Sequence, residues 1–112
     1  MMKKYKLNDF KGGWFIGDFE PSLEATPGFE VAVKYYKKGD TDAVHFHKVA
    51  DEYTVIVSGK YLINKKEYSE GDIIHFEPND ISNFKCLEDG ATAVVKIPSV
   101  KVDKYIVTDY EK

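Results

Sequence analysis

Three residues near the middle of the chain carry side chains that commonly bind metal ions. His45 and His47 lie two positions apart, so on a β-strand both imidazoles point to the same side, with their backbones roughly 7 Å apart. The polar segment 48–51 predicts a hairpin loop, which would fold a strand beginning at Glu52 back beside the histidine strand. Two imidazoles and one carboxylate on one face suit ferrous iron, and they also accept manganese, nickel or zinc.

The composition is that of one globular domain spanning residues 1–112. Hydrophobic residues make up 43% of the chain, which is enough to build a core. The formal net charge is −3 and the basic residues are scattered, so the sequence lacks the basic stripe that nucleic-acid binding requires. All 16 basic residues are lysine, so any phosphate recognition must rely on lysine or backbone groups rather than on arginine.

Cysteine content and hydropathy favour a cytoplasmic protein without a membrane partner. Cys86 is the single cysteine, which excludes an intramolecular disulfide, and we expect it to pack as a small hydrophobic residue. The chain begins with Met-Met-Lys-Lys, but no apolar run follows, and no later segment is long enough to span a bilayer.

The pattern of short apolar runs predicts an all-β fold. About ten short strands are separated by turn residues every eight to twelve positions, and no amphipathic helix is evident. Segment 29–36 alternates clearly, with Lys34 on the opposite face from Val33. Lys34 can line the cavity or be solvated, and we expect the solvated position. In segment 5–19 we expect a short strand, a glycine turn and a second strand. This spacing is typical of an antiparallel β-barrel or a jelly roll with a ligand pocket at its mouth.

The chemistry-bearing segment resembles the first sequence motif of the cupin superfamily. That motif spans residues 39–59 and reads Gly39-x5-His45-x-His47-x4-Glu52-x6-Gly59, which matches the family at every fixed position. The resemblance implies a small conical β-barrel, also called a double-stranded β-helix, in which His45, His47 and Glu52 bind a divalent metal inside the cavity.

The second cupin motif is only partly kept, over residues 71–83. It begins at Gly71, 11 residues after the first motif, and Pro78 falls one position late. Counted from Pro78, Asn83 occupies the position where the family has its fourth ligand, a histidine. Because an amide oxygen is a weaker donor than imidazole, three outcomes stay open: loose binding, a position left to water or substrate, or no metal.

Three further residues are candidates for the substrate pocket. Tyr36 and Tyr61 are the aromatic residues that we expect to contact a ring-containing ligand, although packing is the commoner role for such side chains. His75 is the remaining histidine and offers a substitute ligand if it faces the cavity. An ordinary position on a strand is the alternative for His75.

Three classes of function fit these residues. The first is a metal-dependent isomerase, lyase or dioxygenase acting on a small polar or sugar-like metabolite, with the ion as Lewis acid. The second is a metal-free isomerase or epimerase resembling the nucleotide-sugar ketoisomerases of the superfamily, in which His45 or His47 moves the proton. The motif His-x-His-Lys supports that resemblance, whereas the absence of arginine opposes it. The third is a non-catalytic module that binds a small ligand.

We also expect a homodimer. Strand edges left exposed at the ends of a small β-barrel need a cover, and small members of the superfamily commonly pair.

Overall fold

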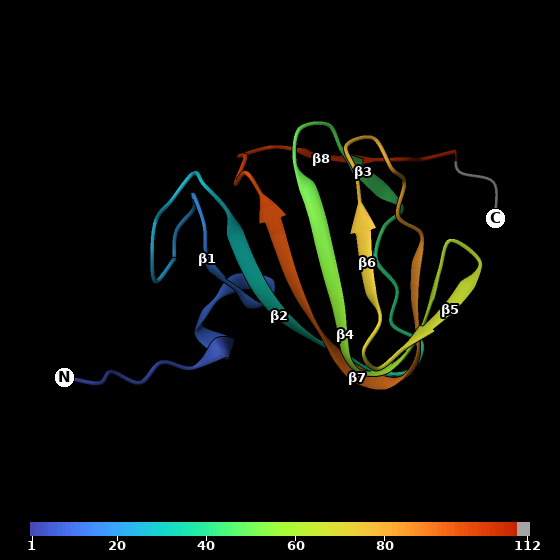
Figure 1. The fold of residues 1–112 in the computed structure, drawn as a ribbon, viewed down its shortest axis with the longest axis horizontal. Helices are drawn as coiled ribbons and strands as arrows, with labels where there is room; N and C mark the ends of the chain where they lie inside the picture. Colours follow the sequence, from blue (N-terminus) through green and yellow to red (C-terminus); the bar gives the residue numbers. More distant parts are fainter. Residues whose placement is uncertain (110–112) are drawn as a thin grey trace.

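The computed structural model describes residues 1–109 and shows two antiparallel β-sheets that face each other (Figure 1). The all-β, double-stranded β-helix architecture is confirmed, although the two sheets do not close into a continuous barrel. The strands are β1 (Trp14–Ile16), β2 (Glu30–Tyr36), β3 (His45–His47), β4 (Asp51–Ile63), β5 (Lys66–Ser69), β6 (Ile73–Phe76), β7 (Phe84–Ile97) and β8 (Lys104–Ile106).

The larger sheet has the strand order β1-β2-β7-β4-β5, and β6 also pairs with β4. Its register places Glu30 of β2 beside Lys96 of β7, and Lys96 in turn beside Glu52 of β4. Since side chains directly opposite each other in a ladder share a face, these three lie in one row across the sheet. That row points into the space between the two sheets.

The smaller sheet consists of β3 and β8 and covers one end of the larger sheet. His45 and Ser82 form an isolated antiparallel bridge, with hydrogen bonds in both directions between their backbones. This bridge ties the histidine strand to the segment that leads into β7. The inner faces of the two sheets enclose the histidines, which are therefore buried.

The predicted hairpin between the histidine strand and the Glu52 strand is wrong. Strand β3 pairs with β8, whereas β4 pairs with β5, β6 and β7. The turn at residues 48–50 therefore carries the chain from one sheet to the other instead of joining neighbours in one ladder. As a result, Glu52 faces the histidines across the gap between the sheets.

Strands β4 and β7 are long, with 13 and 14 residues. Residues 53–57 and 61–63 both belong to β4, whose pairing with β7 shifts register near Ser58 and Lys60. Gly59 has a φ of 91°, and a Cβ there would lie 2.7 Å from the carbonyl oxygen of Glu88. The glycine therefore marks a bulge within a strand rather than a hairpin turn.

The N-terminal segment folds as two short 3₁₀ turns, η1 (Leu7–Asp9) and η2 (Lys11–Gly13), followed by β1. The first of the two strands predicted for segment 5–19 is therefore wrong. Within residues 1–109, no helix has the length and apolar character needed to cross a membrane.

The apolar core lies beside the site, around the C-terminal half of β4, which is flanked by β5 and by the first half of β7. Its buried members are Ile56, Tyr61, Ile63, Phe76, Phe84 and Cys86. Cys86 is fully buried and packs as expected from the sequence. This core gives the neighbouring polar cavity a rigid apolar floor.

Candidate metal centre and ligand cavity

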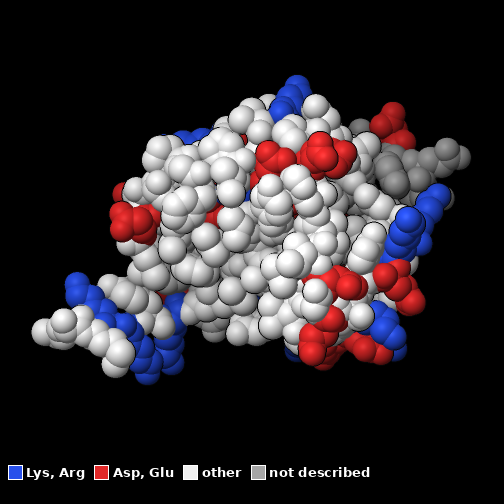
Figure 2. All heavy atoms as spheres, in the orientation of Figure 1, with Lys and Arg blue, Asp and Glu red and all other residues white. Residues whose placement is uncertain are grey.

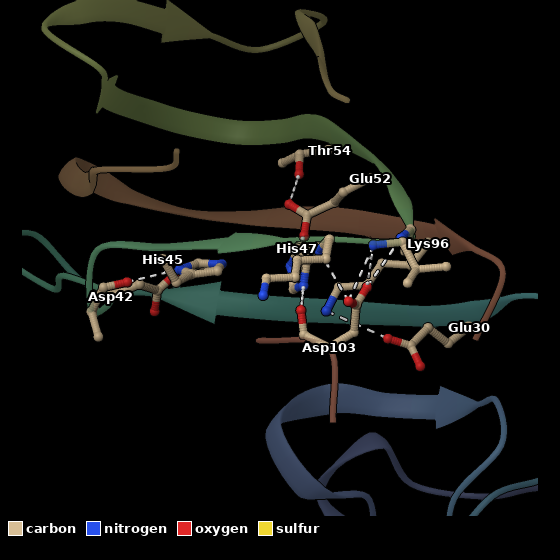
Figure 3. A network of polar contacts seen from close by, with 12 residues as sticks. Glu30, Asp42, His45, His47, Glu52, Thr54, Lys96 and Asp103 are labelled. Carbon is tan, nitrogen blue, oxygen red and sulfur yellow. Dashed lines mark hydrogen bonds and ion pairs between the residues drawn. The ribbon is translucent and has the colours of Figure 1, made fainter. Parts of the chain in front are cut away.

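His45, His47 and Glu52 converge between the two sheets (Figure 3). One ligand atom from each residue can be chosen so that all lie within 4.8 Å of one another. Donor atoms that share one ion at about 2.1 Å lie roughly 3–4 Å apart, so a small side-chain adjustment suffices to bring these atoms to one ion. The structure thus places the three predicted ligands together, although two come from β3 and one from β4.

The hydrogen bonds of the two histidines leave the same ring nitrogen free on each. Nδ1 of His45 lies 2.7 Å from the carbonyl oxygen of Ala43, and Nδ1 of His47 lies 2.9 Å from the carbonyl oxygen of Asp103. A carbonyl oxygen only accepts, so each Nδ1 must carry the proton and donate it. In the neutral rings, each Nε2 therefore holds a lone pair available to a metal ion.

His47 has a buried polar atom without a hydrogen-bond partner. Its Nε2 lies 3.3 Å from Oε1 of Glu52, but it has no hydrogen bond of acceptable geometry among the described residues. With Nδ1 as the donor, a lone pair of Nε2 faces the lone pairs of a carboxylate. Two acceptors this close in a buried position require a positive group between or beside them.

The carboxylate of Glu52 is fixed by neighbours from two strands. Thr54 donates its hydroxyl to Oε2 at 3.0 Å, and Lys96 lies beside Glu52 in the ladder. Burial by itself would raise the pKa of Glu52, but contact with His47, the charge of Lys96 and the hydroxyl of Thr54 together lower it. Glu52 is therefore held as an anion, which is the form that binds a cation.

Burial also keeps His45 in the neutral form. Removal from water lowers the pKa of His45 below its ordinary value of 6.5, and the nearby charge of Lys104 lowers it further. The hydrogen bond to the carbonyl of Ala43 opposes this change without overcoming it. A neutral imidazole is the form that coordinates a metal.

A cavity of about 120 Å³ opens beside His45 and Glu52. Its polar wall includes three lysines and two carboxylates, and its floor is apolar. The lining residues that matter here are Trp14, Lys34, Tyr36, Asp42, Phe76, Ser82, Phe84, Val94, Lys96 and Lys104. An apolar floor with a few convergent polar groups is the usual form of a small-molecule site.

Of the three residues predicted for the substrate pocket, only Tyr36 lines the cavity. Tyr36 lines the cavity, and its hydroxyl lies 3.4 Å from Oδ2 of Asp42. Tyr61 is buried in the apolar core, where it packs edge-on against Tyr36 and its hydroxyl donates to the carbonyl of Ser58. His75 lies on the exposed face of β6, where its Nε2 is 2.8 Å from Oδ1 of Asp51. Tyr61 and His75 are therefore not brought to the cavity.

Asn83 also lies outside the cavity, and Ser82 takes the position next to His45. The backbone of Asn83 pairs with Asn64, through its N–H to Oδ1 of Asn64 and its carbonyl to the N–H of Asn64. Ser82 is buried, lines the cavity and is the direct backbone partner of His45. Side chains of neighbouring residues in an extended segment point to opposite faces, so Ser82 rather than Asn83 lines the cavity.

Two residues outside the predicted ligand set also shape the site. Asp103 is buried, and its carboxylate accepts hydrogen bonds from the N–H groups of residues 48–50 at 3.0–3.2 Å. Lys34 was expected to be solvated but lines the cavity, because the inner face of β2 carries Glu30, Lys34 and Tyr36. The strand alternation identifies that face correctly, but its polarity suggests solvent rather than a cavity.

Solved structures with the same fold share little sequence with this chain. An uncharacterized conserved protein with a double-stranded beta-helix domain from Klebsiella pneumoniae has a TM-score of 0.67 at 16% identity, over 97% of this chain and 100% of that one. A variant of Streptomyces PAC13 with uridine has a TM-score of 0.69 at 16% identity, over 96% and 92% of the two chains. An RmlC-like cupin from Shewanella frigidimarina has a TM-score of 0.62 at 19% identity, over 67% and 70%.

These similarities define the class of protein. The chain has the fold of the RmlC-like cupins, as its first motif indicated. No protein-family model matches the sequence, and no curated protein matches it. At these identities the structural likeness establishes the fold alone, so function must be argued from the site.

Proposed function

We propose that this protein binds a divalent transition metal ion, iron, manganese, nickel or zinc, through Nε2 of His45, Nε2 of His47 and the carboxylate of Glu52. We propose further that it is an enzyme acting on a small polar metabolite in the adjoining cavity. DMSP lyase DddQ from Ruegeria pomeroyi, of which this chain covers 48%, and oxalate decarboxylase from Bacillus subtilis have the same fold, which is compatible with catalysis.

The observation that supports metal binding most strongly concerns the buried Nε2 of His47. It faces Glu52 at 3.3 Å and has no hydrogen bond to any residue in the described range 1–109. A proton on this nitrogen would give an ion pair, but the alignment needed for a good N–H···O bond is not met. A metal ion uses both lone pairs without that alignment. The donor set of two imidazoles and one carboxylate fits such an ion.

When bound, such an ion would polarise a carbonyl or carboxylate oxygen of the metabolite. Other residues of the chain would exclude water, orient the ligand and position the carboxylate of Glu52. The apolar floor, formed in part by Phe76 and Phe84, excludes water from the carbon part of the ligand. Tyr36 and Asp42 form a polar pair on the cavity wall that can orient a hydroxyl of the ligand. Thr54 keeps the carboxylate of Glu52 turned toward the histidines.

The experiment that tests the proposal is elemental analysis of protein purified without chelator, followed by titration with each of the four ions. We expect close to one ion per chain in the wild-type protein. His47→Ala and Glu52→Gln should each reduce the content strongly, because three ligands cannot lose one without a large loss of affinity. His75→Ala is the matched control, since His75 is the histidine outside the site.

Two outcomes would contradict the proposal. Wild-type protein that binds none of the four ions would exclude the metal centre. An equal loss of metal in His75→Ala and His47→Ala would show that binding is not specific to the three-residue site. Circular dichroism of every variant separates loss of ligands from loss of fold.

A second candidate is a metal-free isomerase or epimerase in which His47 and Glu52 move a proton. Their separation of 3.3 Å favours this candidate, because such a pair can share a proton once the ligand has entered. A chelator-treated protein that keeps full activity would favour it. A non-catalytic binding module remains the third candidate, for which ligand binding without turnover is expected.

The remaining parts of the proposal concern location and partners. We propose a cytoplasmic protein whose partner is a small molecule, and no nucleic acid or membrane. The scattered lysines and the single buried cysteine support this.

A further inference from the structure

The cavity wall contains a half-buried ammonium group without an acidic partner. Lys34 lies on the inner face of β2 and lines the cavity, yet it forms no ion pair with any residue in 1–109. Its neighbour Lys96 differs, because Nζ of Lys96 is 3.4 Å from Oε1 of Glu30, and Glu30 also accepts the hydroxyl of Ser99 at 2.7 Å. Of these two lysines, Lys34 is the one with an unused charge.

Lys34 is held in place by an aromatic ring rather than by a carboxylate. Its Nζ lies 5.2 Å from the centroid of Trp14, and Nζ of Lys96 lies 4.8 Å from the same ring. Two ammonium groups therefore lie near the ring of Trp14 at the cavity wall. The positive charge of Lys96 acts unfavourably on that of Lys34, and an anion bound beside Lys34 would relieve this repulsion.

The balance of charge in the cavity also favours an anion. Lys34, Lys96 and Lys104 line it together with Asp42 and Glu52. Glu52 belongs to the metal centre, and Asp42 is placed beside the hydroxyl of Tyr36. A divalent ion bound by His45, His47 and Glu52 would add two positive charges, so the cavity would attract a negative ligand.

The size and floor of the cavity restrict the ligand further. Its volume of about 120 Å³ is close to that of a cavity of roughly 150 Å³ that binds benzene. The ligand is therefore limited to a few carbon atoms. Apolar floor residues such as Phe76, Phe84 and Val94 favour a carbon skeleton over a bare inorganic anion.

From these observations we propose that the cavity takes a small carboxylic acid in its anionic form, with the ammonium group of Lys34 as the contact for a carboxylate. This inference rests on the proposed function, because it names the class of ligand for the same site. Burial lowers the pKa of Lys34 from its ordinary value of 10.5, and the charge of Asp42 partly offsets this. A bound carboxylate offsets it further, so ligand binding and protonation of Lys34 support each other.

Isothermal titration with malonate and malonamide tests this inference. The two probes have nearly the same size and differ in charge. We expect malonate to bind metal-loaded wild-type protein at least about tenfold more tightly than malonamide, because charge-assisted hydrogen bonds are the stronger ones. In Lys34→Met we expect the affinity for malonate to fall about tenfold or more, while the affinity for malonamide changes little.

Matched variants show whether the charge of Lys34 is responsible. Lys38→Met removes an exposed lysine just after β2 and should leave malonate binding unchanged. Lys34→Arg keeps the positive charge and should retain most of the binding even if Lys34→Met is poorly folded. Equal affinity for malonate and malonamide, or inorganic phosphate binding as tightly as malonate, would overturn the inference.

Metal analysis of the same samples separates the two proposals. If wild-type protein contains metal but does not prefer malonate to malonamide, the metal centre stands and the carboxylate site is refuted. Protein that binds no metal, yet prefers malonate in a manner that depends on Lys34, refutes the metal centre and keeps the carboxylate site.

Discussion

The backbone carbonyl oxygen of Asp103 lies 2.9 Å from Nδ1 of His47, while the carboxylate of the same aspartate accepts the N–H groups of Lys48, Val49 and Ala50. One residue from the C-terminal part of the chain thus sets the tautomer of a proposed ligand and also holds the turn that follows it. The position of His47 therefore depends on a contact across 56 residues of sequence.

We expect Asp103→Ala to weaken both the fold and metal binding. The substitution leaves the N–H groups of the 48–50 turn without their acceptor, so it should cost about 2–4 kcal/mol of unfolding free energy. Metal affinity should fall about 10- to 100-fold, as for other residues that orient a ligand. Urea denaturation and metal titration measure the two effects, and Asp103→Asn should show smaller losses.

Glu88→Ala is the control for this prediction, because within residues 1–109 the side chain of Glu88 takes part only in an exposed ion pair with Lys60, at 3.9 Å. Such a pair contributes little, so the variant should behave as wild type. Metal affinity that is unchanged in a folded Asp103→Ala protein would show that Asp103 does not orient His47.

Ser82→His should strengthen metal binding, whereas Asn83→His should not. Ser82 is the hydrogen-bonded partner of His45 and lines the cavity, so an imidazole at this position would point to the proposed metal centre. Asn83 directs its side chain away from the cavity side of the chain, because neighbouring side chains in extended segments alternate. Competition with a chelator measures retention of the ion. The opposite ranking of the two variants would restore the register predicted from the sequence.

Chelator-treated protein should lose stability as the pH falls from about 7 to about 5. Burial is the main cause that lowers the pKa of His45 in the folded state, whereas in the unfolded chain it has its ordinary value of 6.5. Below about pH 6.5 the unfolded state therefore takes up this proton first, and unfolding becomes more favourable. The lowered pKa of Glu52 acts in the same direction, below its ordinary value of 4.5.

Urea denaturation at several pH values measures this dependence, and two variants assign it. His45→Gln should remove the pH dependence of the unfolding free energy between about pH 7 and about pH 5. His75→Gln, which alters the exposed histidine, should leave that dependence in place. A stability that rises on acidification over this range would contradict the assignment.

The homodimer expected from the sequence stays a prediction, and the outer face of the larger sheet is where we expect the second copy. One row on that face joins Val33, Ala93, Val55 and Ile73 across four strands, and the side chain of Ile73 is 66% exposed. Figure 2 shows few charged side chains in the middle of the molecule in this view. An apolar face of this kind is typical of an interface.

Sedimentation at micromolar concentration tests the dimer. We expect Ile73→Lys to shift the protein toward the monomer, because a two-fold contact would place the new charge against an apolar partner twice. Val102→Lys changes an even more exposed apolar residue elsewhere and should leave the dimer intact. A monomeric wild-type protein would refute the expectation.

The grouping of His45, His47 and Glu52 could be predicted from the sequence because their types and spacing are themselves the motif. The way in which they meet could not. The hairpin prediction treated the turn at residues 48–50 as local, whereas a hydrogen-bonding partner at Asp103 directs the chain into the opposite sheet. Such a partner lies too far along the chain to be inferred from spacing.

Two further errors have different physical causes. The sequence places Asn83 at the fourth ligand position, whereas Ser82 is the residue that lines the cavity. The sequence does not fix the length of the turn before these residues, and a shift of one residue reverses the side of an extended chain. Lys34 was assigned to solvent because apolar residues are expected inside. In this fold the inner face of β2 is the polar one, since it surrounds a site, while its outer face carries Val31, Val33 and Tyr35.

His45 and His47 belong to the smaller sheet and Glu52 to the larger one, and among residues 1–109 no strand of one sheet is ladder-paired with a strand of the other. An ion held by all three residues would therefore act as a cross-link between two layers. Removal of the ion should therefore speed amide hydrogen exchange along the whole of β3 and β8, and not only at the three ligand residues. The metal centre that we propose for catalysis would thus also hold the β3–β8 sheet against the larger sheet.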